Sequence, residues 1–328
     1  MDVPSLIAGF EPKVPLESLV EEVNKIYHSF DASRYDREHP EIHWQLPPLW
    51  DEMIAGLPQA RSWSVLDFGC GTGFEANLLL SRLGDKVTKL VAYDPSPEMI
   101  AICRARLEKF PQVTLRSGMD EVHSRGPFNL LITNSLLHHL PNIQQTIESL
   151  LPSLTSDAVW LAGHEPSARF YRNEECLRLL EGYRLYHGRA KWLNFGNYMS
   201  KVRIMFGTHP LKATARAAHK RGLFKKLPSV LAISRIVDFH VAHSVAEVVQ
   251  GRGLDIEKMQ ASFRRDWTLD WSKTYSFLGP HSYANVSDRW VEKARLLGSR
   301  FPADGANFCM VWQKRHGSAS TASTRALI

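Results

Sequence analysis

The sequence predicts an α/β fold in which a Rossmann-like, doubly wound sheet is covered by helices on both faces. From Trp63 to Glu165, short apolar runs alternate with segments of helical periodicity, and this alternation requires mainly parallel strands joined by helical crossovers. A glycine-rich turn directly follows the first apolar run. A last apolar run, ANFCMVWQ, follows a long excursion near the C-terminus. These observations predict one sheet whose final strands form a hairpin-like pair.

The composition is that of an ordinary globular protein. Apolar residues make up 44% and charged residues 23% of the 328 residues, close to average usage. The four cysteines are far apart and show no CxxC spacing, which argues against a zinc site or a disulfide framework. The first residues lack the pattern of a signal peptide, and no run approaches the ~20 apolar residues of a membrane span. We expect a cytoplasmic protein.

The elements can be followed along the chain. Residues 1–62 are expected to form a helical cap, because apolar side chains repeat there at helical spacing: Leu16, Leu19, Val20, Val23, Tyr27 and Phe30. Residues 63–165 form the predicted core, with strands at WSVLDFG, KLVAYD, VTLRS, FNLLITN and AVWLAG. The helix after the first strand should end at Gly84. The next helix should begin at Ser96 and Pro97, a capping residue followed by a first-turn proline.

The alternation stops at Glu165 and resumes near Phe239. Residues 166–236 are therefore interpreted as a helical lid inserted after the fifth strand, and 237–315 as the C-terminal part of the core. In that part we expect a capped helix from Ser244, a strand at DIEKMQASF, a helix around Trp290 to Leu297, and ANFCMVWQ as the final strand. Residues 316–328 are expected to be disordered.

The glycine-rich turn indicates a nucleotide-like cofactor. Residues 67–73 fit D-x-G-x-G-x-G, in which glycines permit a tight turn and a close approach of the ligand. Asp94 ends the second strand, where a carboxylate can accept hydrogen bonds from ribose hydroxyls. Residues 71–76 also satisfy the nicotinamide pattern G-x-G-x-x-A, which is weak alone. Asp67 favours a methionine ammonium over a pyrophosphate, so a nicotinamide-dependent oxidoreductase is the less favoured alternative.

Four segments together resemble the class I S-adenosylmethionine-dependent methyltransferases, particularly the small-molecule branch that includes quinone-biosynthesis enzymes. The segments are VLDFGCGTG, YDPSPEMI, SGMDEV and NSLLHHLPN, in the expected order and spacing. The resemblance covers residues 63–165 well and 239–313 more loosely. It implies a seven-stranded sheet with the last strand antiparallel, S-adenosylmethionine as cofactor and S-adenosylhomocysteine as product.

The resemblance also implies which residues hold the donor. The methionine and ribose part of the donor would be lined by Asp67, Gly69, Cys70 and Gly71, and the ribose would be held by Asp94. The adenine would pack against Pro95 and Met99, with Met119 and Asp120 at its edge. The site would be closed from the fourth strand by Asn134 and Ser135. The alternative for the aspartates and glycines of the loop is an ordinary turn with solvated carboxylates.

Methyl transfer is an in-line displacement, so much of its acceleration comes from alignment, and a base is needed only for a protonated nucleophile. His138 and His139 follow the fourth strand, and adjacent helical residues point about 100° apart, so one of them should face the pocket. His139 occupies the position that is usually histidine in the family. His164 and Glu165 end the fifth strand and could act as a base pair. The alternative for all four is a structural role.

No metal site is predicted. His240 and His243 lie near Asp238, but three residues do not define a site, and solvated loop histidines are the favoured interpretation.

The segment from Arg169 to Arg235 concentrates positive charge. It contains 15 Lys+Arg and 3 Asp+Glu, a net charge of +12 within a chain of net +6. Aromatic side chains alternate with these cations: Tyr171, Tyr183, Tyr186, Trp192, Phe195 and Tyr198. Such a lid would suit an anionic acceptor with an apolar or aromatic part. The later half also resembles a basic amphipathic stretch that can lie on a membrane surface, or a solvated face over the core.

The favoured hypothesis is a small-molecule methyltransferase. A methyltransferase-like binding protein without turnover is the second. Nucleic acid as the acceptor is disfavoured, because the fourth strand ends in NSLL in place of the N-P-P-aromatic motif of base-amine methyltransferases. The motifs do not specify the acceptor atom or the oligomeric state.

Overall fold

The computed structural model describes residues 3–39, 41–191, 209–280 and 286–315. The predicted disordered tail, 316–328, and three aromatic residues of the insertion, Trp192, Phe195 and Tyr198, lie outside the described residues. Within the described part, no helix is both long enough and apolar enough to span a membrane.

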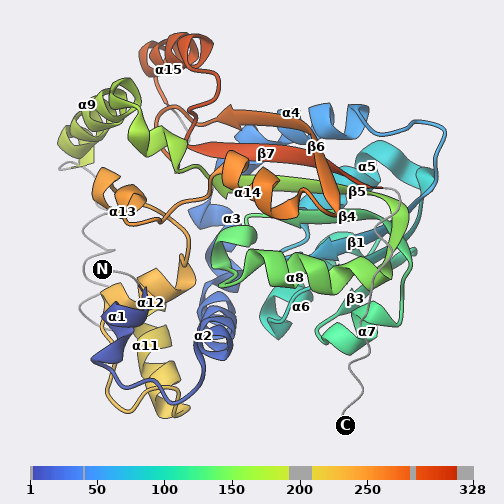
Figure 1. Ribbon diagram of the computed structural model, residues 1–328, viewed down its shortest axis with the longest axis horizontal. Helices are drawn as coiled ribbons and strands as arrows, with labels where there is room; N and C mark the ends of the chain where they lie inside the picture. The colour runs from blue at the N-terminus through green and yellow to red at the C-terminus, as the bar shows by residue number, and fades with distance from the viewer. Residues whose placement is uncertain (1–2, 40, 192–208, 281–285, 316–328) are drawn as a thin grey trace.

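A single seven-stranded sheet organises the molecule (Figure 1). Its strands are β1 (Trp63–Phe68), β2 (Val87–Tyr93), β3 (Val113–Arg116), β4 (Phe128–Asn134), β5 (Leu154–Pro166), β6 (Trp267–Tyr275) and β7 (Asn307–Lys314). They lie in the order β3-β2-β1-β4-β5-β7-β6. β7 is antiparallel to both of its neighbours, and the pairs among β1 to β5 are parallel. The predicted fold class and the antiparallel last strand are confirmed.

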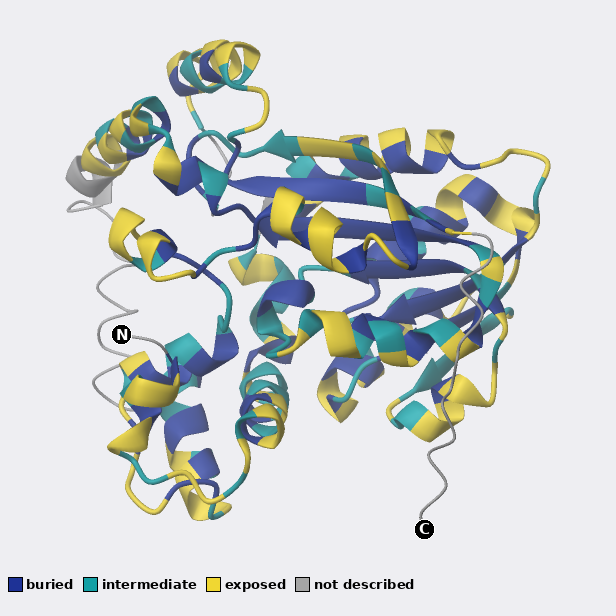
Figure 2. Cartoon of the chain, viewed as in Figure 1, coloured by how far each residue is buried: buried dark blue, intermediate teal, exposed yellow. Residues whose placement is uncertain are grey.

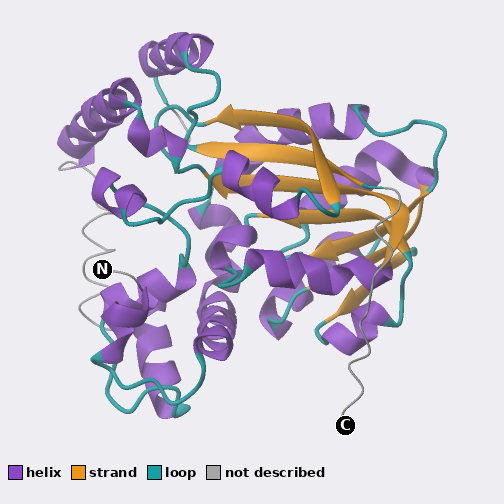
Figure 3. Cartoon of the chain, viewed as in Figure 1, coloured by secondary structure: helices purple, strands orange, loops and turns teal. Residues whose placement is uncertain are grey.

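Helices cover both faces of this sheet (Figure 3). One face packs against α4 (Glu41–Ala55), α5 (Phe74–Leu83) and α6 (Pro97–Leu107), and the other against α7 (Met119–His123), α8 (Ile143–Leu150) and α14 (Ile256–Phe263). Successive side chains of a strand point to opposite faces of the sheet: Val65 packs against the first layer of helices and Leu66 against the second. The strands are consequently buried along most of their length, while the outer faces of the helices are exposed (Figure 2).

The predicted helix ends are confirmed in the core. The Ser96 hydroxyl accepts a hydrogen bond from the Met99 amide at 3.3 Å, with Pro97 in the first turn of α6. Gly84 follows the last residue of α5 with a φ of +54°. Ser244 likewise caps α13 (Val245–Val249) by accepting from the Glu247 amide. Short 3-10 turns join several elements: η1 (Ala32–Arg34), η2 (Gly84–Lys86), η3 (Leu137–His139), η4 (Leu151–Ser153) and η5 (Arg169–Arg172).

The strand predicted at DIEKMQASF is wrong, because these residues form α14. The Asp255 side chain accepts a hydrogen bond from the Glu257 amide and begins the helix. Met259 and Phe263 are four residues apart and both pack into the core, which is helical rather than strand spacing. The sixth strand is instead β6, at the edge of the sheet, where exposed and half-buried side chains alternate along most of its length.

The N-terminal helices and part of the insertion share a second core, away from the sheet. α1 (Val3–Ala8) and α2 (Leu16–Asp31) pack against α11 (Pro210–Lys220) and α12 (Val230–Val237). We call these four helices the helical cover. The apolar faces of α11 and α12 are buried in it through Ala218, Ile233 and Ile236. A helix that lies on a membrane needs an exposed apolar face, whereas the apolar faces of α11 and α12 are buried inside the protein.

A third group of helices lies beyond the carboxyl end of β5. It includes α9 (Glu174–Lys191), α13 and α15 (Asp288–Arg300), of which α15 confirms the helix predicted around Trp290. Tyr171 and Tyr183 are buried in the clusters formed here. The short α3 (Tyr35–Glu38) connects the helical cover to α4.

Candidate functional site

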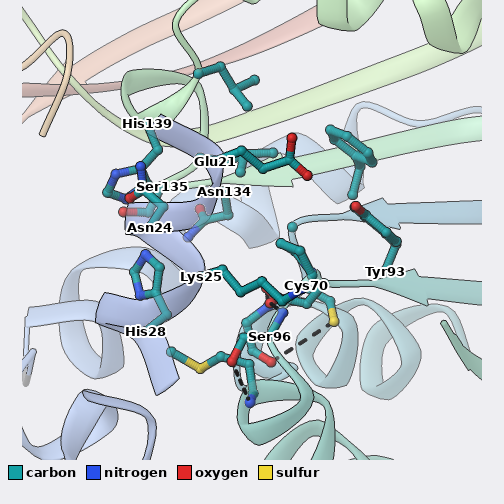
Figure 4. Close-up of a pocket in the computed structure, with 18 of the residues that line it drawn as sticks. Glu21, Asn24, Lys25, His28, Cys70, Tyr93, Ser96, Asn134, Ser135 and His139 are labelled. Atoms are coloured by element: carbon teal, nitrogen blue, oxygen red, sulfur yellow. Dashed lines mark hydrogen bonds between the residues drawn. The ribbon is translucent and has the colours of Figure 1, made fainter. Parts of the chain in front are cut away.

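A cavity of about 470 Å³ lies at the carboxyl ends of β1, β2 and β4, under α2 (Figure 4). This is the edge at which α/β sheets bind ligands. The sheet loops form one side of the cavity, and α2 and the beginning of α8 form another. Its volume falls within the range of small-molecule and cofactor sites.

The glycine turn after β1 forms one wall. The amides of Gly69 and Cys70 both donate to the Tyr93 carbonyl at 2.8 Å, which fixes the turn against β2. Gly71 has a φ of +49°, and a Cβ there would meet no atom within 4 Å. A Cβ on Gly73, in contrast, would lie 2.7 Å from the Cys103 sulfur. Gly73 is therefore required for packing, while Gly71 leaves open space beside the backbone.

Asp94 stands at the end of β2 and lines the cavity. Its Oδ2 accepts from the Gly71 amide at 3.0 Å and its Oδ1 from the Ser96 amide at 2.8 Å. Burial raises the pKa of Asp94 to about 6, partly offset by these two hydrogen bonds. Each carboxylate oxygen can accept more than one hydrogen bond, so Asp94 retains acceptor capacity. Pro95 and Met99 follow it along the same wall.

Two carboxylates predicted to touch the cofactor do not line the cavity. Asp67 lies beneath the glycine turn with 3% of its surface exposed, and burial raises its pKa well above the ordinary value. Its Oδ2 has no hydrogen-bond partner among the described residues. Asp120 also lies outside the lining, whereas the adjacent Met119 belongs to it. Asp67 is two residues after Val65 and therefore points to the same face of the sheet, where the first layer of helices buries it.

The carboxylate that faces the cavity near the glycine turn belongs to Glu75, which the sequence analysis did not select. Asn134 donates from Nδ2 to Glu75 Oε1 at 2.6 Å, and Trp50 donates to Asn134 Oδ1 at 3.4 Å. Burial raises the pKa of Glu75 to about 7. The available signal was an acidic residue in the first turn of α5, two positions after Gly73.

Ser135, beside Asn134, has an unusual backbone conformation. Its φ is +51°, and its amide donates to the Gly163 carbonyl at 2.9 Å. Positive φ values are uncommon for residues other than glycine and concentrate at functional sites. Both Asn134 and Ser135 line the cavity (Figure 4).

The structure separates the two adjacent histidines. His139 lines the cavity, with Nδ1 2.6 Å from the Val237 carbonyl. Burial, and to a smaller extent the neighbouring His138, lowers the pKa of His139 to about 4. His138 lies outside the lining, and its Nδ1 is 2.9 Å from Glu165 Oε2. His139 is thus a neutral imidazole at the cavity, fixed by a carbonyl at the end of α12.

Glu165 and His164 do not line the cavity either. The Glu165 carboxylate accepts from the amides of Leu136, Leu137 and His138 at 2.9, 2.9 and 3.2 Å and is completely buried. Burial raises its pKa to about 7. His164 Nδ1 lies 2.5 Å from the Tyr275 hydroxyl on β6. The pairing of β5 with β7 shifts between Ala162 and Glu165, and such irregularities redirect side chains.

Helix α2 supplies a wall that the sequence analysis missed. Glu21, Asn24, Lys25 and His28 line the cavity, whereas the apolar side of the same helix packs into the helical cover. The His28 ring lies 5.3 Å from the His139 ring, centroid to centroid. Helix α8 and the residue that caps it add further polar side chains to the lining: Asn142, Gln145, Thr146 and Ser149. In contrast, no described residue between 169 and 235 lines the cavity.

Known proteins match the part of the chain that contains these loops. Residues 66–160 match the family model of a methyltransferase domain. The chain carries a class I S-adenosylmethionine-dependent methyltransferase domain.

Relatives of this methyltransferase domain act on different acceptors. A malonyl-(acyl-carrier protein) O-methyltransferase from Acetivibrio thermocellus is 32% identical over 135 residues, 41% of this chain and 46% of the relative. A trans-aconitate 2-methyltransferase from Methylobacterium nodulans is 31% identical over 127 residues, 37% of this chain and 47% of the relative. A tRNA U34 carboxymethyltransferase from Shewanella frigidimarina is 28% identical over 103 residues, 30% of each chain. The chain thus spans less than half the length of these relatives.

The cavity of the methyltransferase domain fits a cationic donor. Among its described lining residues are the carboxylates of Glu17, Glu21, Glu75 and Asp94, and Lys25 is the one lysine or arginine. The open space at Gly71 and the remaining acceptor capacity of Asp94 suit a ribose lying against the backbone. S-adenosylmethionine carries a positively charged sulfonium, which an acidic cavity stabilises.

Proposed function

We propose that this protein transfers a methyl group from S-adenosylmethionine to a small-molecule acceptor. One observation carries the proposal: a single cavity extends from the glycine turn and Asp94 to His139 and the polar side of α2. A donor against the glycine turn and an acceptor below α2 would share that cavity. Holding both reactants together is the main requirement of a displacement reaction.

In this proposal the walls of the methyltransferase domain hold the donor. Asp94 accepts hydrogen bonds from the ribose hydroxyls, and Gly69, Cys70 and Gly71 let the backbone approach the ligand. Pro95, Met99 and Met119 pack around the adenine. Asn134, Ser135 and Glu75 lie near the ammonium of the methionine part, where the Glu75 carboxylate takes the role first assigned to Asp67. When bound, the donor supplies an electrophilic methyl group.

The residues at the other end position the acceptor. The Nδ1–H of neutral His139 donates to the Val237 carbonyl, which leaves the Nε2 lone pair to accept a hydrogen bond from the reacting group. Because burial holds the pKa of His139 near 4, the imidazole is a weak base. We therefore expect His139 to align the acceptor and not to remove the acceptor's proton before methyl transfer.

We infer that the acceptor carries one anionic group, which pairs with Lys25. Lys25 projects from α2 into the cavity (Figure 4), and the carboxamides of Asn24 and Asn142 also line the cavity. In this proposal the acceptor is recognised by α2 and not by the basic insertion.

The proposal is tested by incubating the full chain with S-adenosylmethionine labelled in the methyl group. Candidate acceptors are small carboxylates, phenols, amines and phosphorylated metabolites, with tRNA as a separate arm, and products are identified by mass. We expect label in a small acid and stabilisation of the protein by S-adenosylhomocysteine but not by NAD. Stabilisation by NAD alone, or label in tRNA only, would contradict the proposal.

A further inference from the structure

Three potential metal ligands meet where the end of α12 reaches η3. One ring nitrogen each of His138 and His139 and one carboxylate oxygen of Asp238 lie within 4.8 Å of one another. We propose that these three residues form a binding site for a divalent transition-metal ion. The ligand set is two imidazoles and one carboxylate, drawn from the methyltransferase domain and from the insertion.

Both imidazoles already have the outer hydrogen bonds that metal-ligating histidines need. Such histidines almost always give one ring N–H to a carboxylate or a backbone carbonyl, which orients the ring and leaves the other nitrogen as the ligand. Here His138 Nδ1 faces Glu165 Oε2 at 2.9 Å, and His139 Nδ1 faces the Val237 carbonyl at 2.6 Å. Each ring is therefore oriented through its Nδ1 atom: His138 by a carboxylate and His139 by a backbone carbonyl.

These supporting groups are themselves fixed. Three backbone amides hold the Glu165 carboxylate in place. The Asp238 amide donates to the Ser234 carbonyl at 2.9 Å, and the Asp238 carbonyl accepts from Arg252 Nη2 at 2.6 Å. The two ligand segments are also joined directly, because the His240 amide donates to the His138 carbonyl at 2.9 Å. These contacts hold the two segments together, and the three ligand atoms would have to move closer together to bind one ion.

A third imidazole lies beside the proposed ligands. The buried Nδ1 of His28, whose ring is a neighbour of the His139 ring, has no hydrogen-bond partner among the described residues. An unpartnered buried polar atom beside the cluster is the kind of feature that a bound ion accounts for.

The ligand types indicate the class of ion. Imidazole suits Zn²⁺, Co²⁺ and Ni²⁺, whereas Mg²⁺ and Ca²⁺ prefer oxygen ligands throughout. Three protein ligands leave at least one coordination position for another molecule. Because His139 lines the cavity, that position would adjoin the acceptor end. In the metal-bound form the ion, rather than the His139 lone pair, would contact the acceptor.

The experiment uses the full chain without an affinity tag, dialysed against EDTA and titrated with Co²⁺ and with Zn²⁺ in the absence of donor and acceptor. Binding is followed by the visible absorption of Co²⁺ and by calorimetry. We expect one ion per chain, and a loss of affinity of at least about tenfold in Asp238→Asn. His240→Gln is the matched control, because its ring contacts the Leu140 carbonyl and is outside the ligand set. That variant should bind as the wild type does.

A wild-type protein that binds neither ion would overturn the inference, as would an Asp238→Asn variant that binds both ions unchanged. Circular dichroism shows whether Asp238→Asn folds, and His139→Asn replaces it if it does not. The inference is independent of the proposed function, since binding of S-adenosylhomocysteine to the same samples is measured separately.

Discussion

The proposed donor half of the cavity comes from sheet loops between Phe68 and Ser135, whereas the proposed acceptor half depends on α2, which ends at Asp31 before β1 begins at Trp63. The donor half is built by backbone geometry: positive-φ glycines and amides that a carboxylate holds. The acceptor half is built by side chains on one face of a helix. Because the two halves are built differently, we expect substitutions to alter donor binding and acceptor binding separately.

The largest expected effect comes from the donor half. Replacing Asp94 with alanine removes the proposed ribose acceptors and also frees the amides of Gly71 and Ser96. We expect S-adenosylhomocysteine to bind at least about 100-fold more weakly, because hydrogen bonds to a charged group contribute about 1.5–3 kcal/mol each. Calorimetry measures the affinity, with Asp85→Ala on the surface as the control. Unchanged affinity would show that the ribose contact is misplaced.

A core substitution in α2 should loosen the acceptor half alone. Leu19 is completely buried in the helical cover, and Leu→Ala changes in such places cost about 2–5 kcal/mol. We expect Leu19→Ala to lower the free energy of unfolding by that amount in urea titrations. At temperatures where the variant stays folded, the affinity for S-adenosylhomocysteine should remain within about threefold of the wild type. A parallel loss of donor affinity would show that the two halves are not separable.

Glu75 provides a pH-dependent test at the border of the two halves. Its pKa is about 7 in the folded protein against an ordinary value of 4.5, so the folded state binds this proton more tightly than the unfolded chain. The stabilisation it contributes is complete below about pH 4.5 and is lost as the pH rises to about 7. Between pH 5 and 8, wild-type stability should fall by up to roughly 3 kcal/mol more than that of Glu75→Gln. Urea titrations at both pH values measure the difference, and parallel curves would contradict the assignment.

The smallest expected effect concerns Lys25. Lys25→Met keeps the length of the side chain and removes its charge, so the KM for an anionic acceptor should rise about tenfold, equivalent to about 1.4 kcal/mol. Donor affinity should not change. Lys86→Met, on the surface away from the cavity, is the control. An unchanged KM would show that Lys25 does not bind the acceptor and that another part of the chain does.

The strands and the glycine turn were predictable because local patterns specify them. Apolar runs, a capping serine and a glycine after a helix each act over a few residues, and the predicted sheet is confirmed. The exception, α14, has a short apolar pattern compatible with either a helix or a strand. The strand β6 escaped prediction because an edge strand exposes much of its length and lacks a continuous apolar run.

The candidate site was predictable only where its residues follow a strand. Asp94 follows β2, Asn134 ends β4, His139 lies in the turn after β4, and all three line the cavity. Lys25 and His28 reach it through the packing of α2 on α11 and α12, a contact between segments at least 179 residues apart that no local pattern encodes. Asp67 and Glu75 illustrate a related limit, because both flank the glycine turn and only the three-dimensional arrangement decides which carboxylate faces inward.

The shared core of the helical cover has a consequence for substrate entry. α2 covers the cavity, and it is packed against α12, whose end supplies the carbonyl that holds His139. Moving α2 aside as part of this body would carry α12 with it and withdraw that carbonyl from the imidazole. In such a movement, admission of a substrate and orientation of His139 would be coupled, because the same body carries both α2 and the carbonyl that holds the ring.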